Sequence, residues 1–520
     1  MKKVVKKAAA ILCMLCMTLT MQSCGSSPTD TKTSSAGWTQ NNPGSYTENV
    51  PGSSSQITNK GVFFTYNGEK YYRNGRALLH MVDDNTSEYV KIYDADKLAD
   101  TSVPDRMKEY YEKTGEQYDP KESLLDVGVY HDYVCLFDGS DLYEPMWDSG
   151  VLCHYRFVAP NMVEEERLYE AEDIKPLVKR LMEQYPSFHN EDSLAFNLLH
   201  ELVCPQDGGD GFIYASVHDS NPLKSRLVRY AKDGSLYEIV DGVYASDLVI
   251  NDGWLYCYDS GYTWDVKAEK ASFDDKRRGI YKMKPDGSEK TKLTGVYEDT
   301  KPQDNDILKG IAGMSVVGES LYYVQMNSDD LYYLYKLDLN GGTPEKVSDN
   351  SCYTYCIDTQ NQMLYFWGTD EPNKKGFLAE RNLSDGTERV ICNWNYLRQP
   401  NDCRIQLDGD YLYISGLNYM GRIVEIEGKE AKKKDGTYVM VTEPEYQVYK
   451  ECLSGQRVNI KTGKEDRMFY YSLVHMEMDS LGIERVSYSE PWKVVWKSVD
   501  EIDQTLKQIA EKYDLATDGI

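Results

Sequence analysis

The chain has 520 residues, 41% of them hydrophobic, a mean hydropathy of −0.59 and a formal net charge of −26. The length allows one large all-β domain with insertions, or two or three ordinary domains. The charge argues against nucleic acid and anionic lipid headgroups as ligands, because such a surface repels phosphate groups. Tyr outnumbers Phe by 43 to 11. Because Tyr favours half-wet sheet surfaces, this bias indicates β structure.

The first residues have the pattern of an export signal. Four lysines lie within the first seven residues, and residues 8–21 form an apolar stretch that is short for a membrane span. The next residues, "LTMQSCGSS", resemble a bacterial lipobox. This resemblance implies that residues 1–23 are a lipoprotein signal peptide, that Cys24 is lipidated, and that the chain is anchored to the extracytoplasmic face of the cell membrane. Met21 and Gln22 depart from the commonest lipobox residues, so an ordinary secretory signal stays open as the alternative.

Residues 24–59 are rich in Ser, Thr, Gly, Asn and Pro and have no apolar periodicity. This composition is typical of a flexible tether, with a root-mean-square reach of about 30–35 Å. We therefore expect the folded part to begin near residue 60 and to be held off the membrane surface.

The cysteines do not form a convincing disulfide framework. Of the 12 cysteines, two lie in the leader and one is Cys24, which leaves an odd number at irregular spacing. Several stand inside apolar runs such as "DYVCLF" and "WLYCYD", where a free thiol packs as a small hydrophobe. A bridge between Cys392 and Cys403 stays open as an alternative.

A unit of about 50 residues repeats along the chain. Its turn dipeptides follow short alternating strands at Asp233-Gly234, Asp286-Gly287, Asn340-Gly341, Asp385-Gly386 and Asp435-Gly436. An earlier strand of each unit carries an apolar residue followed by Tyr, at Ile213-Tyr214, Leu255-Tyr256, Leu321-Tyr322, Leu364-Tyr365 and Leu412-Tyr413. Asp-Gly and Asn-Gly favour tight hairpin turns, so each unit predicts three or four antiparallel strands.

Units of this size predict the blades of a β-propeller, because one blade cannot bury both of its faces alone. The five clear units cover about residues 207–450, and weaker strand pairs precede and follow them. We predict an all-β propeller over residues 60–497, with six or seven blades and with terminal strands that share the closing blade.

The repeated unit "DGWLYCY…GIYKMKPDGSEKTKL" resembles those of the six-bladed, TolB-like β-propellers. More narrowly, the chain resembles an uncharacterised bacterial lipoprotein family whose propeller is likened to that of low-density-lipoprotein-receptor-related proteins. The resemblance implies the fold and gives little about function, since propellers host many unrelated activities.

Three segments break the strand pattern. Residues 173–204 space Leu177, Leu181 and Tyr185 on one helical stripe and further leucines on a second, which predicts a helical hairpin. A shorter helix is expected in 103–115. Residues 498–520 open with a capping box and predict a C-terminal helix.

Motifs for catalysis or metal binding are mostly missing. "HELVC" at His200 to Cys204 departs from the zinc motif H-E-x-x-H at its last position, and the following Pro205 suggests that the helix ends there. We find no nucleophile elbow, P-loop or dinucleotide-binding motif. We therefore predict no catalytic residue, no metal site and no cofactor.

Calcium binding is the one metal-binding alternative that the sequence leaves open. Acidic clusters stand at 83–88, at 207–211 and around Asp304 and Asp306. None has the ligand spacing of an EF-hand, so loop acids in contact with solvent are the preferred interpretation.

The leading hypothesis is a non-enzymatic, lipid-anchored extracytoplasmic propeller that binds a protein or glycan through long loops on one face. Tyr258, Tyr262, Trp264 and Tyr419 are candidate contact residues, because rigid aromatic side chains give large contact area. The alternative for these residues is packing between blades.

The alternative function is a propeller enzyme acting on extracellular polysaccharide or peptide, and a third is a structural or sensing subunit of a membrane complex. Functional residues are expected in the irregular insertions rather than in the repeat. The sequence leaves the oligomeric state open.

Overall fold

The structure is a computed structural model, and the residues that it describes are given next. These are 63–66, 68–73, 78–93, 136–137, 141–146, 151–200, 202–218, 223–265, 268, 270–294, 310–327, 331–369, 376–393, 404–415, 422–426, 431–432, 438–439, 446–478, 483–487, 493–498, 500–501, 504 and 508.

Four antiparallel sheets of four strands follow one another along the middle of the chain. They are β10 (Leu202–Asp207), β11 (Phe212–Val217), β12 (Arg226–Ala231) and β13 (Tyr237–Tyr244); β14 (Asp247–Asn251), β15 (Trp254–Asp259), β18 (Gly279–Met283) and β19 (Thr291–Thr294); β20 (Ile311–Val317), β21 (Ser320–Met326), β22 (Tyr332–Asp338) and β23 (Glu345–Lys346); and β24 (Thr354–Asp358), β25 (Met363–Thr369), β26 (Gly376–Asn382) and β27 (Glu388–Asn393).

The strands before β10 and after β27 form two larger sheets. The five-stranded sheet has the order β5 (Lys91–Tyr93), β9 (Met162–Tyr169), β8 (Val151–Ala159), β7 (Asp141–Met146) and β6 (Leu136–Phe137), with β5 parallel to β9. The 11-stranded sheet has the order β1 (Phe63–Tyr66), β2 (Glu69–Arg73), β3 (Leu78–Met81), β4 (Thr86–Tyr89), β36 (Lys493–Ser498), β34 (Glu465–Met478), β33 (Tyr446–Asn459), β29 (Tyr411–Ser415) and β28 (Arg404–Asp408), with β30 (Arg422–Ile426) beside β33 and β35 (Ile483–Ser487) beside β34.

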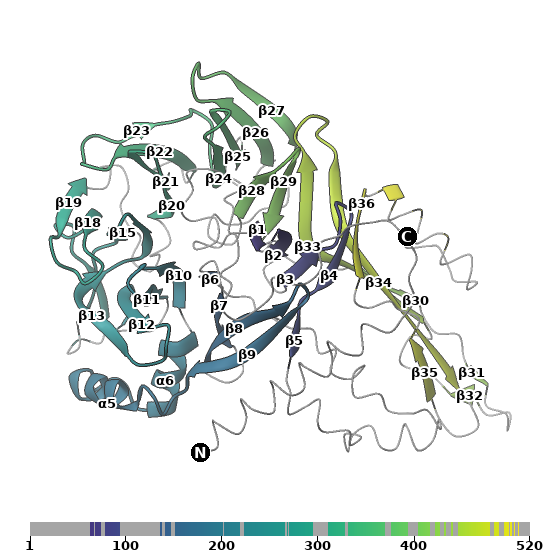
Figure 1. Cartoon of the computed structure of the whole chain (residues 1–520), viewed down its shortest axis with the longest axis horizontal. Helices are drawn as coiled ribbons and strands as arrows, with labels where there is room; N and C mark the ends of the chain where they lie inside the picture. Colours follow the sequence, from purple (N-terminus) through teal and green to yellow (C-terminus); the bar gives the residue numbers. More distant parts are fainter. Residues whose placement is uncertain are drawn as a thin grey trace.

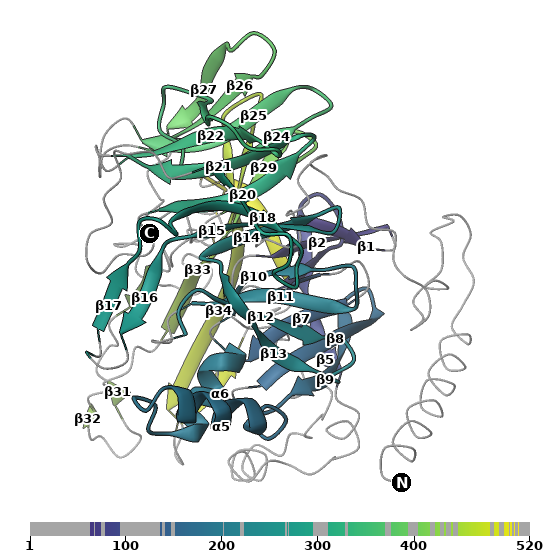
Figure 2. The same ribbon diagram turned by 90° about the vertical axis from the view of Figure 1, so that its left-hand side faces the viewer.

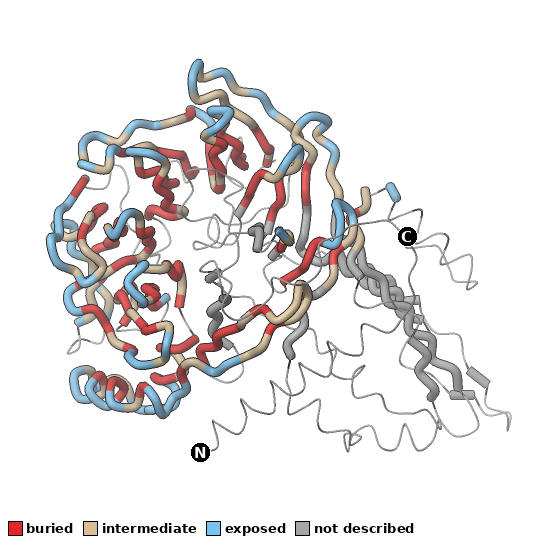
Figure 3. The backbone as a smooth tube through the Cα atoms, in the orientation of Figure 1, coloured by how far each residue is buried: buried red, intermediate tan, exposed pale blue. Residues whose placement is uncertain are grey.

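The sheets stand around a ring, so the predicted β-propeller is confirmed (Figure 1). Buried residues lie mainly in the sheets, and the outer turns are exposed (Figure 3). The ends of β33 and β34 extend away from the ring as an arm with β30 and β35 (Figure 1). Two small hairpins are added, β16 (Tyr262–Asp265) with β17 (Lys270–Phe273) and β31 (Ala431–Lys432) with β32 (Tyr438–Val439).

The repeated apolar–Tyr pair builds the cores between neighbouring sheets. Adjacent residues in a strand point to opposite faces of its sheet, so each pair serves two interfaces. Leu255 packs in one cluster with Tyr214 of the preceding sheet, whereas Tyr256 packs in another with Leu321 of the following sheet. The same relation joins Tyr322 to Leu364 and Tyr365 to Leu412. The recurrence in the sequence is therefore the recurrence of one packing contact.

The repeated turn makes a second contact of the same kind. Gly234, Gly287 and Gly341 all have positive φ, as predicted for their turns. A Cβ on Gly287 would lie 2.8 Å from Val243 Cγ2, and one on Gly341 would lie 2.9 Å from Leu293 O. Each of these turns therefore closes against the outer strand of the preceding sheet, which only glycine permits at this distance.

The two edges of the ring differ in what they carry. In each four-stranded sheet, the first and second strands, and the third and fourth, are joined at one edge by short turns such as 208–211, 252–253 and 318–319. We call this edge the turn face. The opposite edge carries the connections between sheets and between second and third strands, including 170–201 and 260–278. We call it the insertion face, and Figure 2 shows β16 and β17 projecting from it.

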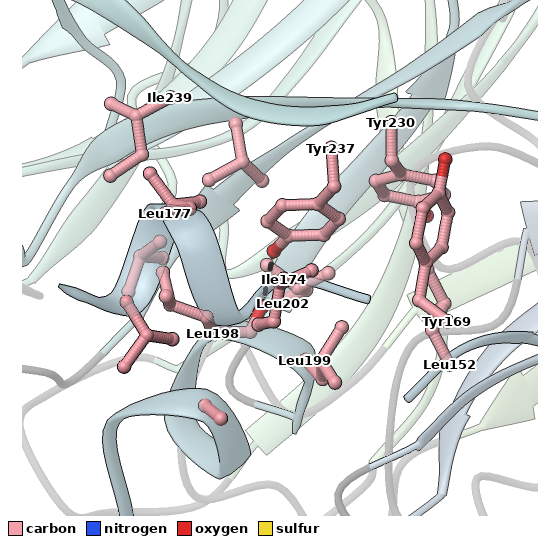
Figure 4. Packing of buried hydrophobic residues seen from close by; sticks show 14 of the residues in the cluster. Leu152, Tyr169, Ile174, Leu177, Leu198, Leu199, Leu202, Tyr230, Tyr237 and Ile239 are labelled. Atoms are coloured by element: carbon pink, nitrogen blue, oxygen red, sulfur yellow. Dashed lines mark hydrogen bonds between the residues drawn. The ribbon is translucent and has the colours of Figure 1, made fainter. Parts of the chain in front are cut away.

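The helical insertion is confirmed as α5 (Lys175–Gln184) and α6 (Glu191–His200). Its predicted leucine stripes are buried against β12 and β13, where Leu177 and Leu198 meet Tyr230, Tyr237 and their neighbours (Figure 4). The Tyr237 hydroxyl donates to the Leu198 carbonyl. The hairpin thus extends a core between sheets and replaces a short loop.

The ring closes through β36, which lies between the outer strands of its first and last repeats. Val495 is paired with Phe469 of β34 on one side and with Thr86 of β4 on the other. Beside this junction Arg457 is 2% exposed; its Nε lies 2.9 Å from Asp466 Oδ2, and Nη2 donates to Asn85 Oδ1 at 2.9 Å. N-terminal strands β1–β4 and C-terminal strands β28, β29, β33, β34 and β36 therefore belong to one sheet, and the closing blade that they were predicted to share stays a prediction.

The predicted C-terminal helix begins with its capping box. Ser498 N donates to Glu501 Oε2 at 2.9 Å, and Glu501 N donates to Ser498 Oγ at 3.3 Å. The carboxylate also accepts from Ser498 Oγ at 2.7 Å, and these bonds from the Ser498 side chain and backbone hold the pKa of Glu501 below its usual value. The leader, the tether, the Asp435-Gly436 turn and the helix expected in 103–115 lie outside the described residues.

Substituting the turn glycines should separate backbone strain from contact between sheets. Gly253→Ala places Ala at φ +69° with nothing within 4 Å of its Cβ, and we expect a loss of about 1–2 kcal/mol in the free energy of unfolding. Gly341→Ala adds the close approach to Leu293 O, so we expect about 1–3 kcal/mol more. Urea denaturation measures both; equal losses would contradict the contact between sheets.

The buried tyrosines should make the fold sensitive to alkali. Burial raises the pKa of Tyr214 and of Tyr365 to about 12, whereas an unfolded Tyr ionises near pH 10. Below pH 10 these tyrosines are neutral in both the folded and the unfolded chain, so the free energy of unfolding should be at its full value there. It should fall as the pH rises toward 12, because the unfolded chain then ionises its tyrosines more readily. Denaturation midpoints at pH 8 and 11 measure the fall, which Tyr365→Phe should lessen. Full tyrosinate absorbance in a chain that is still folded would oppose this expectation.

Candidate functional site

The innermost strands are linked to one another near the insertion face by the side chain of Asp247. Asp247 is 4% exposed and begins β14. Its Oδ1 accepts from Cys204 Sγ at 3.1 Å in β10, and its Oδ2 accepts from Met314 N at 3.1 Å in β20. One carboxylate therefore connects three successive sheets, and its oxygens are already occupied by donors that hold the ring together.

The hairpin β16–β17 stands on a buried ion pair. Asp259 ends β15 and is 1% exposed, and Arg277 precedes β18; Arg277 Nε lies 2.9 Å from Asp259 Oδ2 and 3.1 Å from Oδ1. Gly261 N donates to the same carboxylate at 2.8 Å, and Arg277 Nη2 donates to the Tyr262 carbonyl. Burial raises the pKa of Asp259, and the Arg277 guanidinium opposes that rise. The pair fixes the base of the hairpin.

This pair continues into the neighbouring sheet as a row of five side chains. The Arg277 Cζ lies 4.0 Å from the centre of the Tyr244 ring, and the Arg226 Cζ lies 5.0 Å from the same ring. Arg226 Nη2 is 3.6 Å from Asp241 Oδ1. We call Asp241, Arg226, Tyr244, Arg277 and Asp259 the charged row; it runs from an acid that is 98% exposed to one that is fully buried.

Two of the predicted contact residues are buried in the insertion face. Tyr258 and Tyr262 are each 2% exposed; Tyr258 packs in the core between the second and third repeats, and the Tyr262 ring packs on Phe273. Trp264 is half-buried in β16. Their positions favour the packing alternative for the tyrosines, while the binding role of the hairpin as a whole stays a prediction. Tyr419 and Cys24 lie outside the described residues.

Sequence reasoning did not find the charged row. The only local signal is that an acid and a base flank the hairpin at matching positions: "DSG" precedes it and "RRG" follows it, with alternating strands between them. The partners Arg226 and Tyr244 come from another repeat, and no spacing rule connects them to Arg277. Asp247 gave no signal, because one more acid before an apolar strand is common in a chain with 84 acidic residues.

The motif at His200 does not form a zinc site. Residue 200 ends α6 and stacks on Phe196 with ring centres 4.8 Å apart, whereas Cys204 lies in β10 at φ 52°. The two side chains therefore do not share a helical face, as zinc binding by this motif requires. Within the described ranges, no group of three His, Cys, Asp or Glu side chains could hold a metal ion.

Among the acids proposed for calcium that the structure describes, three are used in hydrogen bonds or an ion pair within the fold. Asp207 Oδ2 is 2.8 Å from Lys232 Nζ, and Asp210 Oδ2 accepts from the Tyr214 hydroxyl at 2.8 Å. Asp83 Oδ1 accepts from Asn85 N and Thr86 N, each at 2.7 Å. Asp304 and Asp306 lie outside the described residues, so calcium there stays an untested alternative.

Six cysteines of the described residues have reduced thiols: Cys153, Cys204, Cys257, Cys352, Cys356 and Cys392. Cys403, the partner that the sequence left open for Cys392, lies outside the described residues, so this bridge stays untested. Burial raises the pKa of Cys392 to about 11 and that of Cys257 to about 12, so these thiols remain protonated at neutral pH. In the described part of the chain, no helix has both the length and the hydropathy of a membrane span.

Comparisons with known proteins bear on the fold. No protein-family model matches the chain, and no curated protein matches its sequence. Similar solved structures include a nidogen/laminin complex at 12% identity (TM-score 0.33; 63% of this chain and 92% of the other), a TolB from Agrobacterium tumefaciens at 11% (0.28; 56% and 87%) and an oligogalacturonate lyase in complex with manganese at 10% (0.34; 68% and 84%). At these TM-scores the fold assignment depends on the chain's own sheet topology.

Breaking the ion pair should destabilise the hairpin and the sheet that bears it. Arg277→Gln leaves the Asp259 carboxylate buried without its guanidinium, and we expect a loss of about 3–5 kcal/mol in the free energy of unfolding. Asp259→Asn in the same chain should recover part of this loss, because it removes the uncompensated charge. Urea denaturation gives the energies, and limited proteolysis reports cleavage within 262–273.

Arg389→Gln is the matched control. Arg389 Nε lies 2.8 Å from Glu380 Oε1, but the arginine side chain is 54% exposed, so its loss should cost less than about 1 kcal/mol. If Arg277→Gln and Arg389→Gln cost the same, the pair does not fix the hairpin.

Proposed function

We propose that this chain is a lipid-anchored, extracytoplasmic β-propeller that binds a protein or glycan partner through its insertion face. The observation that carries the proposal is the difference between the two edges of the ring. The turn face consists of short turns whose polar groups are used within the turns themselves. The connections that carry the helical hairpin, the β16–β17 hairpin and the arm all leave the ring at the insertion face. Residues added beyond the needs of the fold are the usual place of recognition.

The charged row supports this assignment, because it holds one added element rigidly. A four-residue strand pair such as β16–β17 is marginal in water by itself. Here Arg277 connects the carbonyl of Tyr262 to a buried carboxylate, so the hairpin is held in one orientation before a partner arrives. Such preorganisation lowers the entropic cost of binding.

The proposal includes a ring of seven blades. Its support is the number of four-strand units: the four separate sheets, β6–β9, β1–β4, and β28, β29, β33 and β34. In this interpretation the 11-stranded sheet is two neighbouring blades joined by β36 at their outer strands.

The alternative of a propeller enzyme gains no support from the described carboxylates. Asp247 and Asp259, which are the buried acids of the insertion face, are both held by structural donors. A general acid or base needs a carboxyl group that can reach a substrate proton.

Photo-crosslinking from the two faces tests the proposed binding face. A photoreactive amino acid replaces exposed Lys270 or Asp265 on the insertion face, and exposed Ser384 or Thr462 on the turn face, in the full chain expressed in its own cell envelope. We expect discrete adducts from positions 265 and 270 and none from 384 and 462. Adducts from the turn face alone, or from neither face, would refute the proposal.

Fractionation tests the anchor separately. The Cys24→Ser chain should leave the membrane fraction, because one lipid-bearing residue is then lost and the acidic chain has no other affinity for anionic lipid. A variant that stays in the membrane fraction would argue against lipidation at Cys24 without bearing on the binding face.

A further inference from the structure

The two arginines that flank the Tyr244 ring differ in their partners. Arg277 has a carboxylate within hydrogen-bond distance and a backbone carbonyl acceptor. In the described part of the chain, Arg226 forms one ion pair, with Asp241 at 3.6 Å, which is longer than a hydrogen bond. Among the described residues, Arg226 Nε is buried without an acceptor. Arg226 therefore has unused capacity as a donor.

That difference is unusual for a guanidinium in this position. The Arg226 side chain is only 11% exposed, and a cation removed from water is costly unless an anion is close to it. The Tyr244 ring compensates in part, but a contact between a cation and a ring returns less than a charged hydrogen bond. Among the residues that the structure describes, none gives Arg226 a close anionic partner at hydrogen-bond distance, so an anion from outside would complete the site.

We propose that Arg226 binds a carboxylate group of the partner at the edge of the insertion face. Asp241 serves as a stand-in for this group: its carboxylate already approaches Arg226 Nη2, yet its side chain is 98% exposed and can turn away. The neighbouring Gly242 has φ +73°, and the pairing of β12 with β13 is irregular there. An incoming carboxylate takes the place of Asp241 and accepts hydrogen bonds from the Nη2 edge of the guanidinium, because Nε itself is buried.

Charge favours a single carboxylate over phosphate or a polyanion. The chain carries a net charge of −26, so each additional negative charge on a ligand is repelled. An acidic side chain of a protein partner brings one charge on an otherwise neutral surface. That the carboxylate comes from a protein partner rests on the proposed function. The inference extends that function by naming the chemical group that Arg226 recognises.

Titration with small acids tests the site in the full chain. The unfolding temperature is followed against acetate, phosphate and the peptide N-acetyl-Gly-Glu-Gly-amide, with chloride holding the ionic strength constant. We expect saturable stabilisation by acetate and by the peptide, with the peptide binding more tightly, and none by phosphate beyond its ionic strength. No saturation by any carboxylate, or tighter binding of phosphate, would overturn the proposal.

Three variants test whether Arg226 is the residue that binds the carboxylate. Arg226→Gln should weaken binding of the peptide at least tenfold, as the loss of one charged hydrogen-bonding partner predicts. Asp241→Asn should strengthen it, because the competing carboxylate is gone. Arg389→Gln removes the same charge elsewhere and should bind like the parent chain.

Unchanged binding in Arg226→Gln, or weaker binding in Asp241→Asn, would contradict the site. Circular dichroism shows whether Arg226→Gln is misfolded. If it is, the binding of the peptide to Asp241→Asn decides.

The outcomes separate this inference from the proposed function. Saturable binding at Arg226 with no adducts from Lys270 or Asp265 would support the carboxylate site and reject the insertion face as a partner surface. Adducts that persist unchanged in Arg226→Gln, with no binding of carboxylate, would support the partner surface and reject the site. Tighter binding of acetate than of the peptide would assign the carboxylate to a free small acid and overturn its assignment to a protein partner.

Discussion

Every sheet of this protein needs a neighbour on both faces, and a row of such sheets satisfies that need only when it closes into a ring. The apolar–Tyr pairs make the requirement explicit: Leu255 and Tyr256 are adjacent in one strand, yet each completes a different core with a different neighbour. A sheet left without a neighbour would expose a face of large aromatic side chains. All other features of the fold depend on the closure that prevents this exposure.

The closure is built from residues at opposite ends of the chain. Strand β36 pairs with β34 and β4, and Arg457 beside it is satisfied by the Asp466 carboxylate, by Asn85 Oδ1 and by the Asp84 carbonyl. The guanidinium also lies 4.2 Å from the centre of the Tyr411 ring. A planar group with five donors suits this place, because it must bond in several directions while it is shielded from water.

The sequence predicted what repeats and missed what occurs once. Asp286-Gly287 and Leu255-Tyr256 recur with their local partners, so the blade could be recognised from spacing alone. The stripes of α5 and α6 were likewise local, since helical periodicity is visible within one segment. Arg457, Asp247 and the charged row join residues from different repeats. Their pairing depends on how the repeats are placed in space, and the sequence of one chain carries no direct record of that placement. For the same reason Tyr258 and Tyr262 were considered for binding, although packing buries both.

The joining of β4 to β36 also bears on how the chain acquires its structure. Thr86 and Val495 are paired, yet they are separated by about 400 residues. By the loop-closure relation, bringing such distant segments together costs about 5 kcal/mol of chain entropy before any contact is made. The contact forms only once β36 has been synthesised, so until then β4 has an unpaired edge. A chain that ends before β36 would keep that edge unpaired, and unpaired strand edges are where aggregation begins.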